Sequence, residues 1–273
     1  MISFTEDVRT DISQTLLSLR FEMRKHLKRR RLYMVTLLAL VLPTLFYFIP
    51  QFFDVEFPES GDSFASNNLS FLGILVIICG SLFAGDTISG EFENKTSLMI
   101  LPLPHRRTSI LVGKYLAALI ATCFAISLYY LITSLEVVAA YGVADLSLSL
   151  LKSWLVALLY CSCVVSVVFF FSSALSRSIT STLVGFFTLL MVLPVVANVL
   201  RIVDINPWYI ITHEAGLITD IFALPSPFIG QAGPWANYEL FLPEFYTGVW
   251  VMTVHAVGFL LLGMIIASRK QVG

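Results

Sequence analysis

The sequence predicts an all-α integral membrane protein with six transmembrane helices, and three observations support this. Hydrophobic residues make up 57% of the 273 residues and charged residues only 13%, about half the charged share of a typical soluble domain. Six apolar stretches approach the ~20 helical residues that cross a bilayer. The basic residues are concentrated on one side of these stretches. We therefore treat residues 1–273 as one transmembrane domain.

The six predicted spans contain no Asp, Glu, Lys or Arg. They also contain three pairs of small residues spaced four apart, which predict close helix contacts. These pairs are Ser81 with Gly85, Ala117 with Ala121, and Gly263 with Ala267. The predicted spans are Leu32–Ile49, Leu69–Gly85, Tyr115–Leu135, Trp154–Leu175, Ile179–Leu200 and Thr247–Ala267.

The basic residues predict that both termini are cytoplasmic. With the N-terminus inside, 15 of the 17 Lys and Arg residues fall in inner segments, and only Lys152 and Arg201 fall outside. Cytoplasmic loops carry such an excess of basic residues. The polar first thirty residues lack the apolar core of a cleavable signal peptide. We expect a multi-pass protein of the cell (cytoplasmic) membrane, surrounded by the lipid bilayer.

Residues 1–31 predict an amphipathic helix in the inner interface of the membrane, followed by a basic flank. Apolar residues recur at steps of three and four, the opposite face is charged, and a basic run ends the segment. The alternative is a basic topology signal preceded by an unstructured tail. The apolar positions are Val8, Ile12, Leu16, Leu19, Met23 and Leu27.

The outer segment 201–246 is too polar to span the membrane and too apolar for a free loop, so we predict short helices at or in the outer leaflet. If Trp208–Leu224 is helical, Glu214 projects from the middle of its apolar face. A carboxylate there must be paired, protonated or near water. Three interpretations stay open: a local salt bridge, for instance with Arg201, an extension to the surface, or an outer gate of a transport pathway.

Catalytic and cofactor-binding residues are scarce in this sequence. The predicted spans hold one histidine, His255, and no carboxylate, which argues against an intramembrane protease and a proton-coupled transporter. We interpret His255 and the serines of the fourth span as packing residues and the four cysteines as small buried hydrophobes. Gly113 and Lys114 are not part of a phosphate-binding loop. We expect no metal or cofactor in this chain and no nucleic-acid partner.

The inner loop 86–114 resembles the type 2 ABC transporter permease family. That family typically shows Glu, then Gly-Thr, a Leu-rich stretch, Pro-x-x-Arg, and a Gly-Lys pair that opens the third span. Lys95 stands where glycine is usual. The matching positions here are Glu91, Thr96, Pro104, Arg107, Gly113 and Lys114.

The resemblance implies a permease subunit that pairs with a second, identical or related permease and docks a cytoplasmic ABC ATPase, where ATP and Mg²⁺ would bind. The loop would be the element that couples the two, with Leu98–Leu101 as an apolar plug inside a charged rim. A loop that only rests on the headgroups is the alternative. The expected ATPase-coupling residues are Glu91, Phe92, Glu93, Thr96, Leu98, Met99, Arg107 and Lys114.

The predicted function is therefore ATP-driven export or flipping of a hydrophobic or amphipathic substrate. Two other classes stay open. One is an ATP-independent secondary transporter or channel, against which the lack of ionisable residues in the predicted spans and of an evident inverted repeat argues. The other is a membrane anchor or assembly factor without transport activity.

The distribution of basic residues leads to a topology test. Single cysteines at Glu59 and Glu239, on a cysteine-free background, should react with an impermeant thiol reagent added outside the cell. A cysteine at Lys95 should stay unlabelled until the membrane is opened. The opposite labelling pattern would reverse the predicted orientation.

Overall fold

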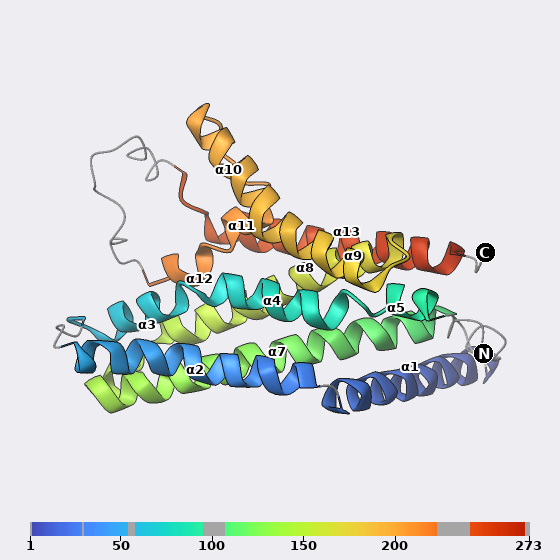
Figure 1. Cartoon of the computed structure of the whole chain (residues 1–273), viewed down its shortest axis with the longest axis horizontal. Coiled ribbons are helices and arrows are strands. Elements are labelled where there is room, and N and C mark those ends of the chain that lie inside the picture. The colour runs from blue at the N-terminus through green and yellow to red at the C-terminus, as the bar shows by residue number, and fades with distance from the viewer. Residues whose placement is uncertain (1, 29, 54–57, 95–106, 223–240, 271–273) are drawn as a thin grey trace.

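The computed structural model describes residues 2–28, 30–53, 58–94, 107–222 and 241–270. Most of the described helices run along one direction and form an elongated bundle (Figure 1). Six described stretches are long and apolar enough to cross a membrane, which confirms the predicted class and number of spans. Both ends of the chain lie at the same end of the bundle, as an even number of crossings requires (Figure 1).

Two of the six spans are interrupted. The second comprises α3 (Gly61–Leu69), α4 (Leu72–Ala84) and α5 (Ser89–Glu93). The fifth comprises α9 (Ser178–Phe187), the π-helix η2 (Thr188–Val192) and α10 (Leu193–Ile202). The others are the continuous helices α2 (Arg30–Phe52), α7 (Arg107–Tyr141), α8 (Leu148–Ala174) and α13 (Phe245–Arg269). Outside the spans lie α1 (Ile2–Lys28), the 3₁₀ turn η1 (Val143–Asp145), α11 (Ile211–Glu214) and α12 (Leu217–Asp220).

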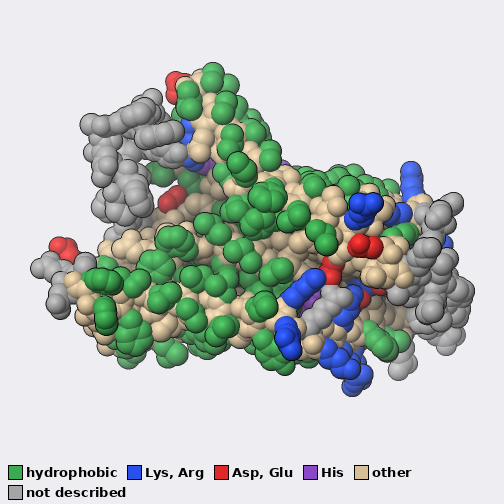
Figure 2. All heavy atoms as spheres, in the orientation of Figure 1, with side chains coloured by type: hydrophobic (Ala, Val, Ile, Leu, Met, Phe, Trp, Pro, Cys, Tyr) green, Lys and Arg blue, Asp and Glu red, His purple; other side chains and the backbone are tan. Residues whose placement is uncertain are grey.

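The interior of the bundle is formed by α4, α8 and α7. In the most apolar part of each span, 72% of the residues are buried in the second span, 67% in the fourth and 50% in the third. The first and fifth spans bury only 17% and the sixth 22%. Green hydrophobic side chains consequently cover much of the visible surface (Figure 2). Such a surface requires lipid or another membrane chain around it.

The fifth span bends where its π-helix meets Pro194. Proline has no backbone N–H, so it cannot donate the helical hydrogen bond that an ordinary residue would give at this position. The wider π turn precedes it, and α10 then diverges from the bundle (Figure 1). Proline and π-turns are recognised causes of such bends.

The prediction that no ionisable residue lies inside a span was wrong. The observed helices extend past the predicted ranges, so that Asp86, Lys114 and Glu136 belong to spans and are all buried. Each has a polar partner; the Glu136 carboxylate, for example, accepts a hydrogen bond from the Asn68 amide at 3.1 Å. Hydropathy ended the predicted spans too early because it treats every charge as solvated, whereas a paired charge can be buried.

The predicted N-terminal helix α1 is present, but residues of its apolar stripe are exposed and several of its polar side chains pack against other helices. Its polar side chains pack inward: Ser18 donates to the Ile110 carbonyl of α7, and Glu22 and His26 are buried. Ile12 and Leu16, from the predicted apolar stripe, are 55% and 57% exposed. Part of the polar face is therefore an intramolecular contact, whereas Arg20, Arg24 and Lys28 are exposed.

The outer segment forms short helices, as predicted, but Trp208–Leu224 is not one helix. The chain turns between α11 and α12, which pack against α13 and α8 respectively. The expected apolar face is nevertheless buried, with Ile211, Leu217 and Ile218 each at most 3% exposed. Residues 223–240 of this segment lie outside the described residues.

The predicted packing roles are confirmed. Ser81, Ala117 and Ala121 are buried, Gly85 lies against Thr182 of α9, and Gly263 lies against Phe169 of α8. His255 bonds its own helix at the Val251 carbonyl. The fourth-span hydroxyls of Ser162, Ser166 and Ser173 donate to nearby backbone carbonyls.

Candidate functional site

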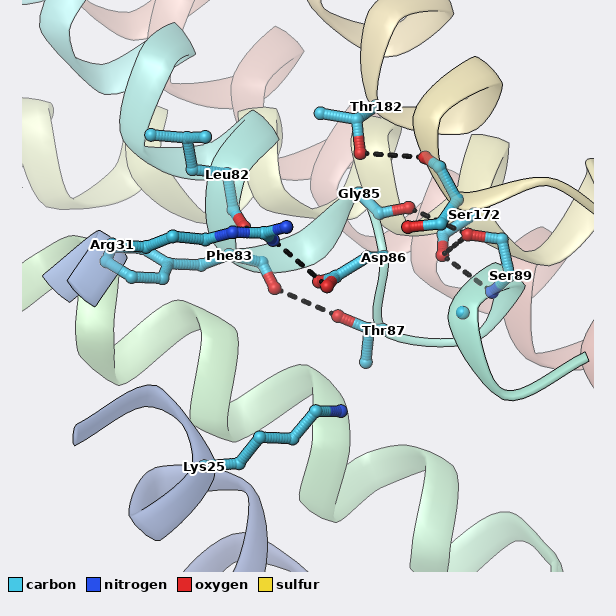
Figure 3. Close-up of polar contacts among 12 residues, drawn as sticks. Lys25, Arg31, Leu82, Phe83, Gly85, Asp86, Thr87, Ser89, Ser172 and Thr182 are labelled. Carbon is cyan, nitrogen blue, oxygen red and sulfur yellow. Dashed lines mark hydrogen bonds and ion pairs between the residues drawn. The ribbon is translucent and has the colours of Figure 1, made fainter. Parts of the chain in front are cut away.

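The candidate site is built around the break between α4 and α5. The backbone N–H groups of Ile88 and Ser89 leave the helical pattern and both donate to the Ser172 hydroxyl of α8, at 3.0 and 3.2 Å. The Gly85 carbonyl accepts from Ser89 and from Ser181 of α9. Figure 3 shows Ser172 and Ser89 facing each other across this break. Hydroxyls from two other spans thus replace the hydrogen bonds that the interrupted helix lacks.

An ion pair holds the same break on its other side. Arg31, at the start of α2, places Nη1 3.0 Å from the Asp86 carboxylate and 3.4 Å from the Leu82 carbonyl (Figure 3). Asp86 is only 7% exposed. The break is therefore anchored to the first, fourth and fifth spans.

Three consecutive residues of α5 contact three different parts of the chain. Glu91 accepts a hydrogen bond from Lys114 of α7 at 2.5 Å. The Phe92 ring lies 4.7 Å from the ammonium of Lys270, directly after α13. The Glu93 carboxylate accepts from the backbone N–H of Ser178, at the start of α9, where a helix favours negative charge. A displacement of α5 would therefore act on the third, fifth and sixth spans together.

Lys114 joins α5 to the N-terminal helix. Its ammonium bonds Glu91 on one side and Glu22 of α1 on the other, both at 2.5 Å, and its side chain is 4% exposed. The second oxygen of Glu22 accepts from Lys25 at 3.0 Å. We call Glu22, Glu91 and Lys114 the lysine triad.

Gly113 makes this arrangement possible. A Cβ at this position would lie 2.6 Å from the Ser18 Cβ and 2.8 Å from the Thr15 carbonyl, both in α1. The Gly-Lys pair that opens the third span therefore combines two functions. The glycine admits α1 closely against α7, and the lysine binds the carboxylates that the close approach brings near.

The electrostatics of the triad favour its charged form. Burial alone would raise the pKa of Glu22, but the ammonium groups of Lys114 and Lys25 outweigh this effect and lower it to about 2. The carboxylate thus stays ionised at neutral pH. A buried ion pair of this kind contributes little net stability but strongly disfavours the loss of one partner.

The C-terminal end of α13 completes the site. Lys270 donates to the Ser173 and Leu175 carbonyls at the end of α8, at 3.0 and 2.7 Å, and Arg107 donates to the Ser268 carbonyl. Burial lowers the pKa of Lys270. Exposed backbone carbonyls at a helix end attract such cations.

The predicted coupling residues divide into two groups. Glu91, Phe92, Glu93, Arg107 and Lys114 come together at one end of the bundle. Thr96, Leu98 and Met99 lie outside the described residues. Glu91 and Glu93, predicted at the rim of a docking surface, also make the internal contacts described above.

The sequence did not identify Glu22, Lys270 or Ser172 as members of the site. A glutamate in the amphipathic helix and a lysine directly after the last span are weak indications of a site, because charges near a membrane boundary are common. Among the described residues, no group of three or more His, Cys, Asp and Glu is placed to hold a metal ion.

Glu214, in α11, forms a separate site away from α5 (Figure 1). It is 1% exposed, and neither of its carboxylate oxygens has a hydrogen-bond partner among the described residues. It fits against α13 only because residue 248 is glycine, where a Cβ would lie 2.4 Å from its Oε2. Burial raises the pKa of Glu214 to about 7, and the nearby Glu244 carboxylate adds to this.

Two of the three interpretations of Glu214 were wrong. The side chain does not extend to the surface, and the Arg201 guanidinium contacts Nδ1 of His213 instead. Burial, with Arg201 adding to it, lowers the pKa of His213 to about 4, so the neutral ring can accept this bond. The gate interpretation stays a prediction.

The lysine triad leads to a stability test. Lys114→Met should destabilise the protein by about 3–5 kcal/mol, because the buried Glu22 and the partly buried Glu91 lose their shared cation. Thermal unfolding in detergent measures the effect. The triple variant Glu22→Gln, Glu91→Gln, Lys114→Met should recover much of the loss, because no carboxylate of the triad is left unpaired and Lys25, which loses Glu22, is partly exposed. A Lys114→Met protein that unfolds at the wild-type temperature would contradict the triad.

Comparison with known proteins agrees with this architecture. A search of the curated proteins finds no match. The model of a protein family described as ABC-2 family transporter protein matches residues 18–198. This range includes α2, α7, α8, the second span, the fifth span as far as Asn198 and all three residues of the lysine triad. Because the match covers more than half of the sequence, this chain belongs to the ABC-2 transporter permease family, as a multi-pass membrane transport subunit.

Proposed function

We propose that the chain is the permease subunit of an ATP-driven transporter and that the inner loop 86–114 couples it to a separate cytoplasmic ATPase. One observation carries the proposal: Glu91, Phe92 and Glu93 contact α7, the end of α13 and α9, and Lys114 extends the connection to α1. A protein that binds the loop next to α5 would therefore move several spans at once.

The ATPase is a separate chain in this proposal. The family implies an ABC ATPase partner, and the sequence carries no phosphate-binding loop of its own. ATP and Mg²⁺ would bind in that partner. The permease would supply the substrate pathway and the mechanical connection, without a catalytic site.

A cavity supports a hydrophobic or amphipathic substrate. About 350 Å³ of space lies between α4, the η2–α10 bend and the α11–α12 segment, partly open to the surface. Its walls are mainly apolar, but the Thr212 hydroxyl, which is buried without a partner among the described residues, lines it as well. Ligand sites commonly combine apolar walls with few polar groups. Ile74, Tyr160, Leu189, Pro194 and Ile218 form other parts of the wall.

We further propose that two such permeases, identical or related, pair in the cell membrane and that transport runs outward, by export or flipping. The weakly buried fifth span and the divergence of α10 leave apolar surface beside the cavity, which a second permease could cover (Figure 1). A secondary transporter or channel would instead work without the ATPase. An anchor or assembly factor would move no substrate at all.

The coupling proposal predicts that loop mutations separate insertion from transport. Leu98→Asp and Met99→Asp should each insert normally, because the loop is outside the lipid, but should lose the ATPase on purification or leave its hydrolysis uncoupled. An unpaired charge in an apolar groove costs several kcal/mol. Co-purification and transport in reconstituted vesicles measure both effects.

A matched control tests whether the position matters. Val143→Asp introduces the same charge at a side chain that is 74% exposed, in the turn after the C-terminal end of α7, whereas the loop precedes the N-terminal end of α7. It should retain the ATPase and normal transport. Wild-type co-purification and transport in both loop variants would overturn the coupling assignment while leaving the membrane architecture intact.

The gate proposal for Glu214 predicts a pH dependence. Because folding raises its pKa from 4.5 to about 7, the folded state binds the proton more tightly than the unfolded state. Folding stability should therefore fall as the pH rises through this window. Glu214→Gln should remove that dependence and alter transport without lowering the amount of protein in the membrane. Thermal unfolding at several pH values and a transport assay check it, and unchanged transport would leave Glu214 only a structural role.

A further inference from the structure

The exposed face of α1 combines large apolar side chains with a row of basic ones. Leu17, Phe21 and Leu27 are 51%, 66% and 49% exposed, in addition to Ile12 and Leu16. On the same face, Arg20, Arg24 and Lys28 are exposed at intervals of four residues, which aligns them along the helix. The acid Glu22 is on the buried face.

A bilayer surface fits this face better than water or a protein does. Water disfavours five exposed large apolar side chains on one helix. A protein interface core is usually depleted of charge, whereas basic rows run through the apolar residues here. Helices of this composition insert their apolar side chains near the headgroups and extend Lys and Arg to the phosphates.

The position of α1 in the chain supports the same occupant. The helix ends at Lys28, and the span α2 begins at Arg30, so the C-terminal end of α1 lies where the first span starts. Figure 2 shows blue basic side chains clustered at that part of the molecule, beside the green surface of the spans. Basic segments next to a span bind anionic headgroups.

We propose that the outer face of α1 binds anionic phospholipid at the membrane surface and that this binding holds α5 in place through the lysine triad. The inner face of α1 carries Glu22, which binds Lys114, which in turn binds Glu91 of α5. Lipid composition would then regulate coupling. This regulatory consequence rests on the proposed coupling function, whereas the lipid binding does not.

Lipid binding is tested on the full-length permease alone, in nanodiscs of phosphatidylcholine with or without phosphatidylglycerol. A fluorophore attached at Leu17→Cys reports contact with spin-labelled phosphatidylglycerol, and protein without the added cysteine gives the background from the native thiols. Quenching should be strong in the wild type, and the affinity for phosphatidylglycerol should fall by about fivefold for each basic residue removed. The test variant is Arg20→Gln, Arg24→Gln, Lys28→Gln.

A control variant removes the same charge elsewhere. Lys152→Gln, Arg177→Gln, Arg269→Gln changes three exposed basic residues outside α1 and should quench like the wild type. Equal quenching in both triple variants would overturn the proposal. So would a fluorophore that no lipid quenches but that the added ATPase shields, because α1 would then be a protein-binding face.

The regulatory step has its own readout. With the ATPase bound, phosphatidylglycerol should stimulate transport-coupled hydrolysis in the wild type and the control variant but not in the α1 variant. Lipid quenching without any stimulation would retain the binding and remove the regulation. Loss of quenching with stimulation intact would show that α1 is not the lipid sensor.

Discussion

The structure depends on one constraint, that every polar backbone group within the membrane must find a partner inside the protein. The second span breaks between α4 and α5, and a break in lipid would leave amide groups unsatisfied. Ser172 and Ser181 supply hydroxyls from the fourth and fifth spans, so the interruption is possible only where these helices meet it. The same contacts bind the short helix α5 to the bundle.

The lysine triad illustrates how a buried charge determines position more than stability. Lys114 exchanges water for two carboxylates from different helices, so its net contribution to folding is small. Its geometry is nevertheless demanding, because both Glu22 and Glu91 must reach one ammonium group. Any motion that separates α1 or α5 from α7 would break one of the two bonds to this buried ammonium group. The triad therefore makes these three helices respond as a unit.

The two ends of the protein use charge in opposite ways. At the α5 end, the charges are paired and tie helices together. At the α11 end, Glu214 is buried with no hydrogen-bond partner among the described residues, and burial raises its pKa to about 7. A paired charge stabilises one relative position of the helices that carry the pair. A buried carboxyl group without a hydrogen-bond partner instead makes the packing around it depend on whether the group is protonated. Under the proposed function, force would enter at the α5 end and substrate would leave at the α11 end, so that the first end would need to be rigid and the second adjustable.

The sequence by itself determined the class, the six spans and the Gly113-Lys114 motif, because hydrophobic length and residue spacing are local properties. It could not determine where Asp86 and Glu136 lie, because hydropathy cannot show that a distant side chain pairs with a charge. Nor could it show that Ser18, Glu22 and His26 of α1 pack inward. Only the tertiary structure decided these points, since burial of a polar group depends on partners that the chain supplies from far away in sequence.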